Sequence, residues 1–414
     1  MTVQLSDIEA ARELLKGIII PTPIIADEKL SAEIGASAFL KAECLQRGGS
    51  FKVRGAYNKI TRLTGEEKKR GVVTASAGNH AQGVALAARL NKTKATIVLP
   101  EFAPLTKIIA TKAQGADVIL KGASFDEAVA YSRQLQAEQG YIYVHAFDDE
   151  LVIAGQGTIG LEIVRDLPDT TVVVVPIGGG GVISGIAIAV KSLMPHVRVI
   201  GVQAENVAAV KRSLAAGEPV EITDQQPTIA DGIAVKRPGE KTLPLIREFV
   251  DEIVEVSEEE IALGIFHCAQ NSRLVVEGAG AAGVAALLGK KIIVKPNDTV
   301  CTILCGGNID ANLLARILEQ VLVRHGRYVI LKVLVLDRPG MLAGLLNQVA
   351  ETGANVVEVY HQRAIWLAPL GRVGIEMILE VRDQQHAHDV HVHLEAAGYY
   401  VEREGQGDWE EKTL

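Results

Sequence analysis

The spacing of apolar residues divides the chain into strands and helices that alternate. Between residues 71 and 144, short apolar runs typical of strands are separated by longer stretches whose apolar residues recur at helical spacing. These patterns predict strands at 71–75, 95–99, 117–120 and 141–144, and helices at 79–90, 105–114 and 124–139. Strands that alternate with helices predict βαβ units and a mainly parallel sheet, in which ligands bind beyond the carboxyl ends of the strands.

A second α/β stretch surrounds the first. Ser6 begins a capping box that predicts a helix through about Lys16, and two prolines make residues 18–25 an extended arm. The same patterns predict strands at 38–43, 171–175, 197–202 and 299–304, and helices at 155–166, 183–193, from Ser257 onward and at 311–324. We therefore expect residues of about 45–150 to form a smaller lobe inserted in a larger one.

The pattern changes after Arg324. Strands are predicted at 328–336, 356–361, 372–381 and 399–402, and helices at 341–352 and 386–397. The resulting order, βαββαβ, is that of a ferredoxin-like unit. The predicted organisation is thus an α/β domain at residues 1–324, a second domain at 325–404 and a polar tail at 405–414.

Length and composition exclude several classes of protein. At 414 residues the chain is too long for one ordinary domain, and its 48% of hydrophobic residues can form a large core. The net charge of −8, without a dense basic cluster, argues against nucleic acid as a partner. The N-terminus lacks the basic start and apolar core of a signal peptide, so we expect a cytoplasmic protein.

Two features could suggest a membrane or metal protein. Residues 170–190 are uncharged, but Pro176 and the four consecutive glycines at 178–181 favour a strand, a loop and a buried helix over a membrane span. The four cysteines show no zinc spacing, so we interpret them as reduced thiols and expect no metal site.

Lys52 is the first candidate for chemistry. It follows Phe51 in the run Ser50-Phe51-Lys52-Val53-Arg54-Gly55-Ala56, close to the start of a predicted helix. A lysine becomes a nucleophile or base only when burial or a nearby cation lowers the pKa of its amine from about 10.4. The alternative interpretation is an ordinary surface lysine, because most lysines are exposed.

The second candidate is a glycine loop, Gly178-Gly179-Gly180-Gly181-Val182, between an apolar strand and a helix. Backbone N–H groups without side chains, together with a helix N-terminus, suit a phosphate group. The dinucleotide fingerprint is absent, because Ile183 and Ser184 occupy the positions where its last glycine would stand. The Walker motif is absent as well. A tight structural turn is the alternative.

Two further loops follow predicted strands. Ser76-Ala77-Gly78-Asn79-His80 offers donors that suit a carboxylate and a phenolic oxygen, although it could be an ordinary helix cap, and His80 by itself indicates nothing. Cys305 could be a small buried hydrophobe or a weak neutral donor to a heteroaromatic nitrogen. A phosphate site combined with a reactive lysine points to pyridoxal 5'-phosphate.

These motifs resemble those of threonine ammonia-lyases, fold type II pyridoxal-phosphate enzymes (tryptophan synthase β-like) with a C-terminal ACT domain. The resemblance covers nearly the whole chain. It rests on the lysine, Ser76–His80 and glycine-loop motifs, and also on the stretches 229–232, 277–280, 337–340 and 353–355.

The resemblance implies a role for each matching residue. Lys52 would hold the cofactor and act as the catalytic base, and Phe51 would pack against its ring. Asn79 would contact the phenolic oxygen, and the glycine loop with Val182 would bind the phosphate. Cys305 would face the pyridine nitrogen, where these lyases usually have serine. The loop Ser76, Ala77, Gly78, Asn79 and His80 would bind the substrate carboxylate, with Gly232 and Glu277 near the site.

Two departures from the family pattern affect the expected function. Racemases of this family carry serine where this chain has Ala77, so elimination of water from L-threonine or L-serine is favoured over racemisation. Gln203 replaces the glutamate that begins the family's divalent-cation site. The ACT domain implies an amino-acid effector, such as isoleucine or valine, and a homo-oligomer.

Alternatives remain open at this point. The chain could be a serine-preferring dehydratase or a racemase of the same family, or an amino-acid sensor with an inactive catalytic lobe. A nucleotide-binding dehydrogenase is disfavoured by the failed fingerprint. The sequence leaves open the role in biosynthesis or catabolism, the effector's identity and sign, and the choice between dimer and tetramer.

Overall fold

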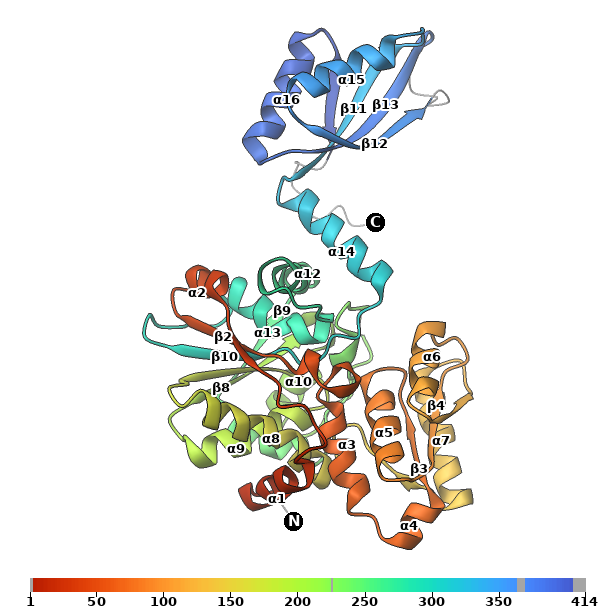
Figure 1. Ribbon diagram of the computed structural model, residues 1–414, viewed down its shortest axis with the longest axis vertical. Helices are drawn as coiled ribbons and strands as arrows, with labels where there is room; N and C mark the ends of the chain where they lie inside the picture. Colours follow the sequence, from red (N-terminus) through yellow and green to blue (C-terminus); the bar gives the residue numbers. More distant parts are fainter. Residues whose placement is uncertain (1–2, 225, 363–368, 405–414) are drawn as a thin grey trace. The chain divides into compact units, whose positions relative to one another are not determined.

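The chain folds into two compact units, residues Met1–Ala311 and Asn312–Leu414 (Figure 1). The structure, a computed structural model, describes residues 3–224, 226–362 and 369–404. The predicted tail at 405–414 lies outside the described residues. The second unit includes nearly all of helix α14 (Ala311–Arg324), and the predicted domain boundary at residue 324 stays a prediction.

The first unit contains a large and a small lobe. The small lobe comprises residues 52–143, and the large lobe is the remainder of the unit. The large lobe has a six-stranded sheet in the order β1-β2-β10-β7-β8-β9, parallel except for β1. Its strands are β1 (Ile24–Ala26), β2 (Ser37–Lys41), β7 (Val172–Pro176), β8 (Arg198–Ala204), β9 (Glu252–Val256) and β10 (Thr299–Ile303).

Helices cover both faces of this sheet (Figure 1). On one face α9 packs against α8, α1 and α11, and on the other α13 packs against α12 and α2. Their bounds are α1 (Leu5–Leu15), α2 (Glu28–Ile34), α8 (Glu150–Asp166), α9 (Gly181–Leu193), α10 (Ala209–Ala216), α11 (Thr242–Phe249), α12 (Glu258–His267) and α13 (Gly278–Leu288). Burial of both faces explains why every residue of β7 is apolar and buried.

The small lobe is built around a four-stranded parallel sheet in the order β5-β4-β3-β6. Its strands are β3 (Val72–Ala75), β4 (Ala95–Leu99), β5 (Asp117–Leu120) and β6 (Ile142–Tyr143). Its helices are α3 (Lys52–Thr61), α4 (Gly65–Arg70), α5 (Asn79–Leu90), α6 (Leu105–Ala113) and α7 (Phe125–Gln139). Two apolar clusters fill this lobe, one with residues of α3, α5 and α6 and one with residues of α7. The strands of this sheet lie in the sequence between β2 and β7 of the larger sheet.

The second unit contains the predicted βαββαβ order. Its antiparallel sheet runs β12-β13-β11-β14, from β11 (Tyr328–Leu336), β12 (Asn355–Gln362), β13 (Arg372–Glu380) and β14 (Tyr400–Glu404). The helices α15 (Met341–Glu351) and α16 (Gln384–Ala396) share an apolar core with the sheet. Alternate residues of β11 are buried in this core, as expected for a sheet with one covered face.

Some predicted helix boundaries were wrong. The first helix begins at Leu5, because Asp7 accepts a hydrogen bond from the backbone of Gln4 at 2.9 Å, so Ser6 lies inside the helix and is not its cap. Helix α8 begins at Glu150, where Asp149 caps two backbone N–H groups, and not at residue 155. Residues 170–190 form β7, a loop and most of α9, as predicted, and none of the helices in the described residues is long and apolar enough to cross a bilayer.

Candidate active site

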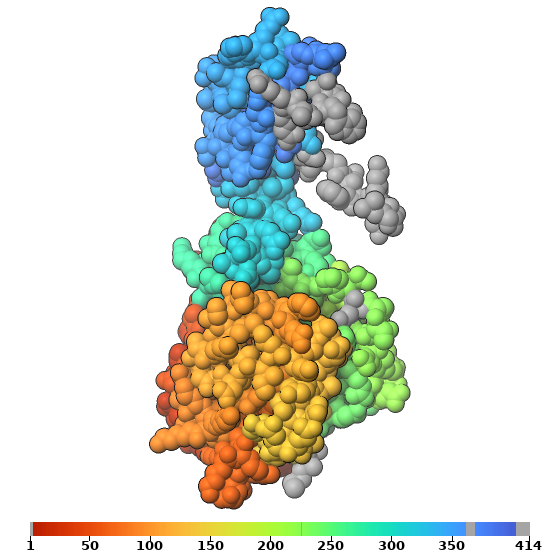
Figure 2. Space-filling model, turned by 90° about the vertical axis from the view of Figure 1, so that its right-hand side faces the viewer, coloured from red at the N-terminus to blue at the C-terminus, as the bar shows by residue number. Residues whose placement is uncertain are grey.

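A cavity of about 760 Å³ opens between the two lobes, where the carboxyl ends of strands from both sheets meet. The loops after β3, β6, β7 and β10 all contribute to its lining. Figure 2 shows the small lobe (orange to yellow) side by side with the green segment of the large lobe that contains Asp231 and Lys236. Two ion pairs join these parts: Lys107 to Asp231 at 2.7 Å and Lys236 to Asp126 at 2.8 Å.

Every site residue that was predicted from the sequence lines this cavity. They are Phe51, Lys52, Ser76, Ala77, Gly78, Asn79, His80, Gly178, Gly179, Gly180, Gly181, Val182, Gly232, Glu277 and Cys305. Residues far apart in the sequence are thus brought together, although the role of each residue stays a prediction.

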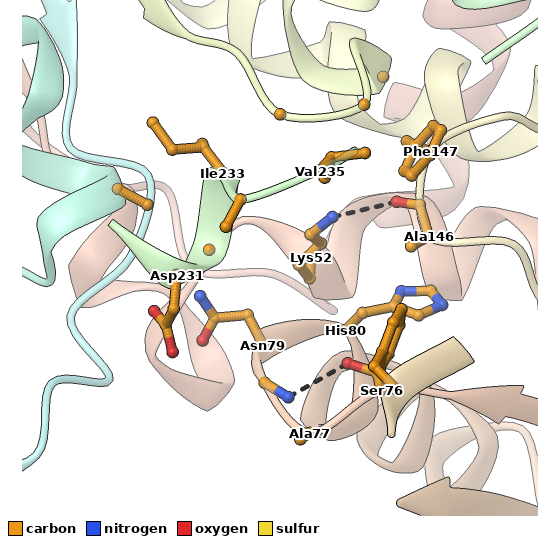
Figure 3. Close-up of a pocket in the computed structure, with 18 of the residues that line it drawn as sticks. Lys52, Ser76, Ala77, Asn79, His80, Ala146, Phe147, Asp231, Ile233 and Val235 are labelled. Carbon is orange, nitrogen blue, oxygen red and sulfur yellow. Dashed lines mark hydrogen bonds between the residues drawn. The ribbon is translucent and has the colours of Figure 1, made fainter. Parts of the chain in front are cut away.

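Lys52 is the first residue of α3, and its amine lies in the cavity (Figure 3). Nζ donates a hydrogen bond to the carbonyl oxygen of Ala146 at 3.0 Å and lies 5.1 Å from the ring centroid of Phe51. Burial lowers the pKa of the Lys52 amine to about 8, although Cys305 and Glu277 act in the opposite direction. About a tenth of the amine is therefore uncharged at pH 7, which gives Lys52 the capacity to act as a base or nucleophile.

A buried network of four charges lies beneath α3. Arg54, two residues after Lys52, pairs with Glu43 at 2.7 Å and with Glu162 at 2.6 Å. Lys41 binds the other oxygen of Glu162 at 2.6 Å. The two cations balance the two carboxylates, so the burial of each charge is compensated by its partners. The network connects β2, α3 and α8 and so fixes the position of the helix that begins with Lys52.

The glycine loop adopts a shape that side chains would prevent. Gly180 has a φ of +96°, in the left-handed region that favours glycine. A Cβ on Gly179 would lie 2.4 Å from ring atoms of Phe147, and a Cβ on Gly181 would lie 2.9 Å from the backbone of Phe147. Because α9 begins at Gly181, its first N–H groups have no partner within the helix and carry partial positive charge. The loop therefore fits an anionic group such as a phosphate.

The loop at residues 76–80 connects β3 to α5. Ser76 Oγ accepts a hydrogen bond from the backbone of Gly78 at 3.2 Å (Figure 3). His80 is buried and its Nε2 donates to the carbonyl oxygen of Val144 at 2.9 Å. Burial, assisted by the charge of Lys52, lowers the pKa of His80 to about 3. The imidazole is therefore uncharged at neutral pH, and the loop offers a carboxylate neutral donors rather than a cation.

Asn79, Glu277 and Asn308 form a polar chain at the side of the cavity. Nδ2 of Asn79 donates to Oε1 of Glu277 at 2.6 Å, and Oδ1 of Asn79 accepts from Nδ2 of Asn308. Burial, with a smaller contribution from Asp231, raises the pKa of Glu277 to about 7. Cys305 lies nearby, and burial raises the pKa of its thiol well above the ordinary value, which keeps it neutral.

Sequence patterns missed three lining residues. His145 follows β6, and its Nδ1 accepts backbone hydrogen bonds from Phe147 at 3.3 Å and from Asp148 at 2.8 Å. Burial lowers the pKa of His145 to about 4, so this ring is also neutral. The ring of Phe147 meets that of His145 edge to face, with centroids 4.6 Å apart. Asn308 ends the run Cys305-Gly306-Gly307-Asn308 after a predicted strand, but no role was predicted for it. The position of His145 directly after a predicted strand was the one signal that could have indicated it.

Gln203, which replaces the glutamate of the family's divalent-cation site, holds its side-chain amide by two backbone hydrogen bonds. Oε1 of Gln203 accepts from the backbone of Lys211 at 3.0 Å, and its Nε2 donates to the carbonyl oxygen of Val207 at 3.5 Å. Across the described ranges, no group of three or more His, Cys, Asp or Glu side chains is arranged to hold a metal ion.

Comparisons with known proteins agree with the chemistry of this cavity. A family model described as pyridoxal-phosphate dependent enzyme matches residues 15–306. The chain is 51% identical over 399 residues to an L-threonine ammonia-lyase of Thermotoga maritima. The aligned region covers 96% of this chain and 99% of that protein. The chain therefore belongs to the family of pyridoxal-phosphate-dependent enzymes, among the threonine ammonia-lyases that it matches along almost their whole length.

Solved structures give the same result for the fold. The processed form of threonine deaminase isoform 2 from Solanum lycopersicum is 40% identical with a TM-score of 0.74, over 77% of this chain and 87% of that chain. Maize serine racemase is 33% identical with a TM-score of 0.73, over 78% of this chain and 99% of that chain.

The cavity fits pyridoxal phosphate on its own geometry. A lysine amine of lowered pKa can bond to the aldehyde, and the glycine loop at the start of α9 can accept the phosphate. A buried neutral thiol, Cys305, can face a ring nitrogen without adding charge.

Proposed function

We propose that the protein deaminates L-threonine to 2-oxobutanoate and ammonia, and L-serine to pyruvate and ammonia, using pyridoxal phosphate held by Lys52. One observation carries this proposal: a single cavity contains three features that the reaction needs. They are the Lys52 amine, whose pKa is lowered, the glycine loop at the start of α9, and the loop at residues 76–80. The likeness to threonine ammonia-lyases along almost the whole chain supports the choice of substrate.

Bound pyridoxal phosphate supplies an electron sink for negative charge at the substrate's Cα. The residues of the chain would orient the reacting groups around it. The N–H and hydroxyl donors at residues 76–80 bind the substrate carboxylate, and the uncharged amine of Lys52 accepts the proton from Cα. The carbonyl oxygen of Ala146 holds that amine by a hydrogen bond of 3.0 Å, so it limits the positions that the base can take.

Elimination is favoured over racemisation because Ala77 carries no acid or base group. A racemase needs a second proton donor on the opposite face of the substrate's Cα, and a methyl group cannot supply one. Loss of the β-hydroxyl as water, followed by hydrolysis of the enamine product, then gives the oxo acid and ammonia. A serine preference or residual racemisation would appear as slower reaction with L-threonine or as D-serine in the product.

The amine of Lys52 is the direct test of this function. The purified protein should show a visible absorbance band after incubation with pyridoxal phosphate and should release 2-oxobutanoate from L-threonine. Lys52→Ala should lose both, whereas the matched surface variant Lys69→Ala should keep both, because Lys69 is exposed and pairs with Glu66, which is exposed as well. A Lys52→Ala protein that turned over threonine at the original rate would refute the proposal.

Regulation belongs to the second unit. A cavity of about 280 Å³ there is lined by the turn between β11 and α15 together with His361. Its lining is Leu336, Asp337, Arg338, Pro339, Gly340, Met341, Leu342 and His361. This volume suits one small amino acid, and Arg338 offers a partner for its carboxylate. We propose that a branched amino acid binds here in a homo-oligomer.

This regulatory proposal has its own experiment. Isoleucine or valine should change the rate of threonine deamination by the full-length protein, and Arg338→Ala should weaken that response without changing the basal rate. Exposed Arg327→Ala is the matched control in the same unit. An unchanged response to both amino acids in Arg338→Ala would contradict the site.

A further inference from the structure

The carboxamide of Asn79 is held at both ends by partners of opposite kinds. Its nitrogen donates to Glu277 Oε1 at 2.6 Å, and its oxygen accepts from Asn308 Nδ2 at 2.5 Å. Asn308 Nδ2 also donates to the carbonyl oxygen of Gly48 at 3.0 Å, which fixes the direction in which its own amide points. Because the Asn308 nitrogen only donates, the oxygen of Asn79 must face it, and the nitrogen of Asn79 then faces Oε1 of Glu277, which accepts.

This arrangement crosses between the lobes. Asn79 is the first residue of α5 in the small lobe, whereas Glu277 caps α13 and Asn308 follows β10 in the large lobe. Figure 3 shows the Asn79 side chain beside the cavity that also holds the Lys52 amine. The hydrogen bonds of Asn79 therefore depend on groups contributed from the opposite side of the cavity.

Glycines leave room for these partners. A Cβ on Gly306 would lie 2.1 Å from Glu277 Oε1 and 2.9 Å from Asn79 Nδ2. A Cβ on Gly49 would lie 2.5 Å from Asn308 Oδ1. At Gly306 the nearest atoms belong to the polar side chains themselves, whereas Gly49 also has a φ of +74°, a conformation that favours glycine in any case. The backbone around Asn79 is thus shaped to admit its two partners.

We propose that Glu277 and Asn308 are positioning residues that fix the Asn79 carboxamide with its nitrogen, not its oxygen, on the side of Glu277. This inference rests on the proposed function and on the contact between Asn79 and the phenolic oxygen of pyridoxal phosphate that the resemblance of the sequence implies. One N–H of Nδ2 is used by Glu277, and the second stays available as a donor. A reversed amide would present a lone pair to an anionic oxygen and repel it.

Exchanging the two partners tests the orientation without removing them. In the double variant Glu277→Gln/Asn308→Asp, the introduced amide can donate to Asn79 Oδ1 and the introduced carboxylate can accept from Nδ2. Asn79 stays held at both ends, but its amide is reversed. Asn308→Asp removes the hydrogen bond to the carbonyl oxygen of Gly48, so circular dichroism of the cofactor-free double variant first checks that it is folded. Its affinity for pyridoxal phosphate should be about 10- to 100-fold weaker, because a hydrogen bond to a charged oxygen is lost.

The measurement is a titration of the cofactor-free protein with pyridoxal phosphate, followed by absorbance and fluorescence of the bound cofactor. The double variant should also show a shifted absorbance maximum, because the charge on the phenolic oxygen loses its donor. A purely structural role would not shift this band. The matched control is Glu260→Gln, a glutamate of the α12 cap, and it should leave affinity and spectrum unchanged.

Two outcomes overturn the inference. One is a double variant with the affinity and spectrum of the unaltered protein. The other is a double variant that binds weakly but has an unshifted band, since the weaker binding would then not come from the phenolic oxygen. If the unaltered protein itself binds no pyridoxal phosphate, the proposed function fails and this inference falls with it. That result is distinct from both outcomes above.

Discussion

Replacement of Glu277 by glutamine should make the cofactor-free protein more stable at alkaline pH. The carboxyl group is 5% exposed, and burial raises its pKa from 4.5 to about 7. Several titratable groups interact with it from neighbouring elements: Asp231, Lys107, Lys52, Cys305 and Cys44. Their combined effect on the pKa of Glu277 is smaller than the effect of burial. Ionisation of Glu277 therefore costs more free energy in the folded state than in the unfolded chain.

The size of this cost follows from the shift in pKa. A rise from 4.5 to about 7 corresponds to about 3 kcal/mol. Because the folded carboxyl holds its proton more tightly, its favourable contribution is complete below pH 4.5 and is lost as the pH rises to about 7. Glu277→Gln cannot ionise. Relative to the unaltered protein, its free energy of unfolding should therefore rise by about 3 kcal/mol between pH 4.5 and pH 8.

Urea unfolding at several pH values between these limits measures the difference, with circular dichroism as the probe of the first unit. Glu260→Gln is the matched substitution at a partly exposed carboxyl. Parallel pH dependences of Glu277→Gln and the unaltered protein would refute the assignment of a raised pKa to this group.

Two further substitutions test the packing around the site. Gly179→Ala places a methyl group 2.4 Å from the ring of Phe147, so it should destabilise the protein by about 1–3 kcal/mol and weaken cofactor binding, whereas Gly65→Ala, with nothing within 4 Å, should do neither. Arg54→Met leaves two buried carboxylates with one lysine and should cost about 3–5 kcal/mol, while Arg165→Met at an exposed pair should cost less than about 1 kcal/mol. Urea unfolding checks both, and equal effects of a site variant and its control would contradict the reasoning.

The sequence predicted most elements because their apolar periods agree with their burial. Strands β4 and β5 and helices α5 and α14 begin and end at the predicted residues. Helix α2 was not predicted, because its seven residues bury only Leu30 and show little apolar periodicity. The start of α8 was missed because the apolar pattern begins several residues after the residue that caps it, Asp149.

Site residues that lie together in one short sequence motif could be predicted. Single residues that only the folded chain brings into the site could not. Lys52 and the glycine loop are recognisable because their neighbours in the sequence define their chemistry. Asn308 lies in one run with Cys305, and His145 directly follows a predicted strand, but nothing beside either residue in the sequence defines its chemistry. Their place in the cavity follows from the two sheets to which β10 and β6 belong, because the carboxyl ends of strands from both sheets meet there. Nor does sequence spacing reveal that Glu277 would be buried beside Asn79.

The buried charges show why a catalytic lysine needs more than its own motif. Lys52 requires surroundings that disfavour a charge, yet Arg54, two residues later, is fully charged and buried. The two conditions are compatible because consecutive residues of a helix face different directions, and Arg54 faces Glu43 and Glu162 while Lys52 faces the cavity. Paired charges anchor the helix on one side, and desolvation lowers the pKa of the amine on the other. The motif therefore combines a fixed position with an amine that can lose its proton, which is what removal of a proton from Cα demands.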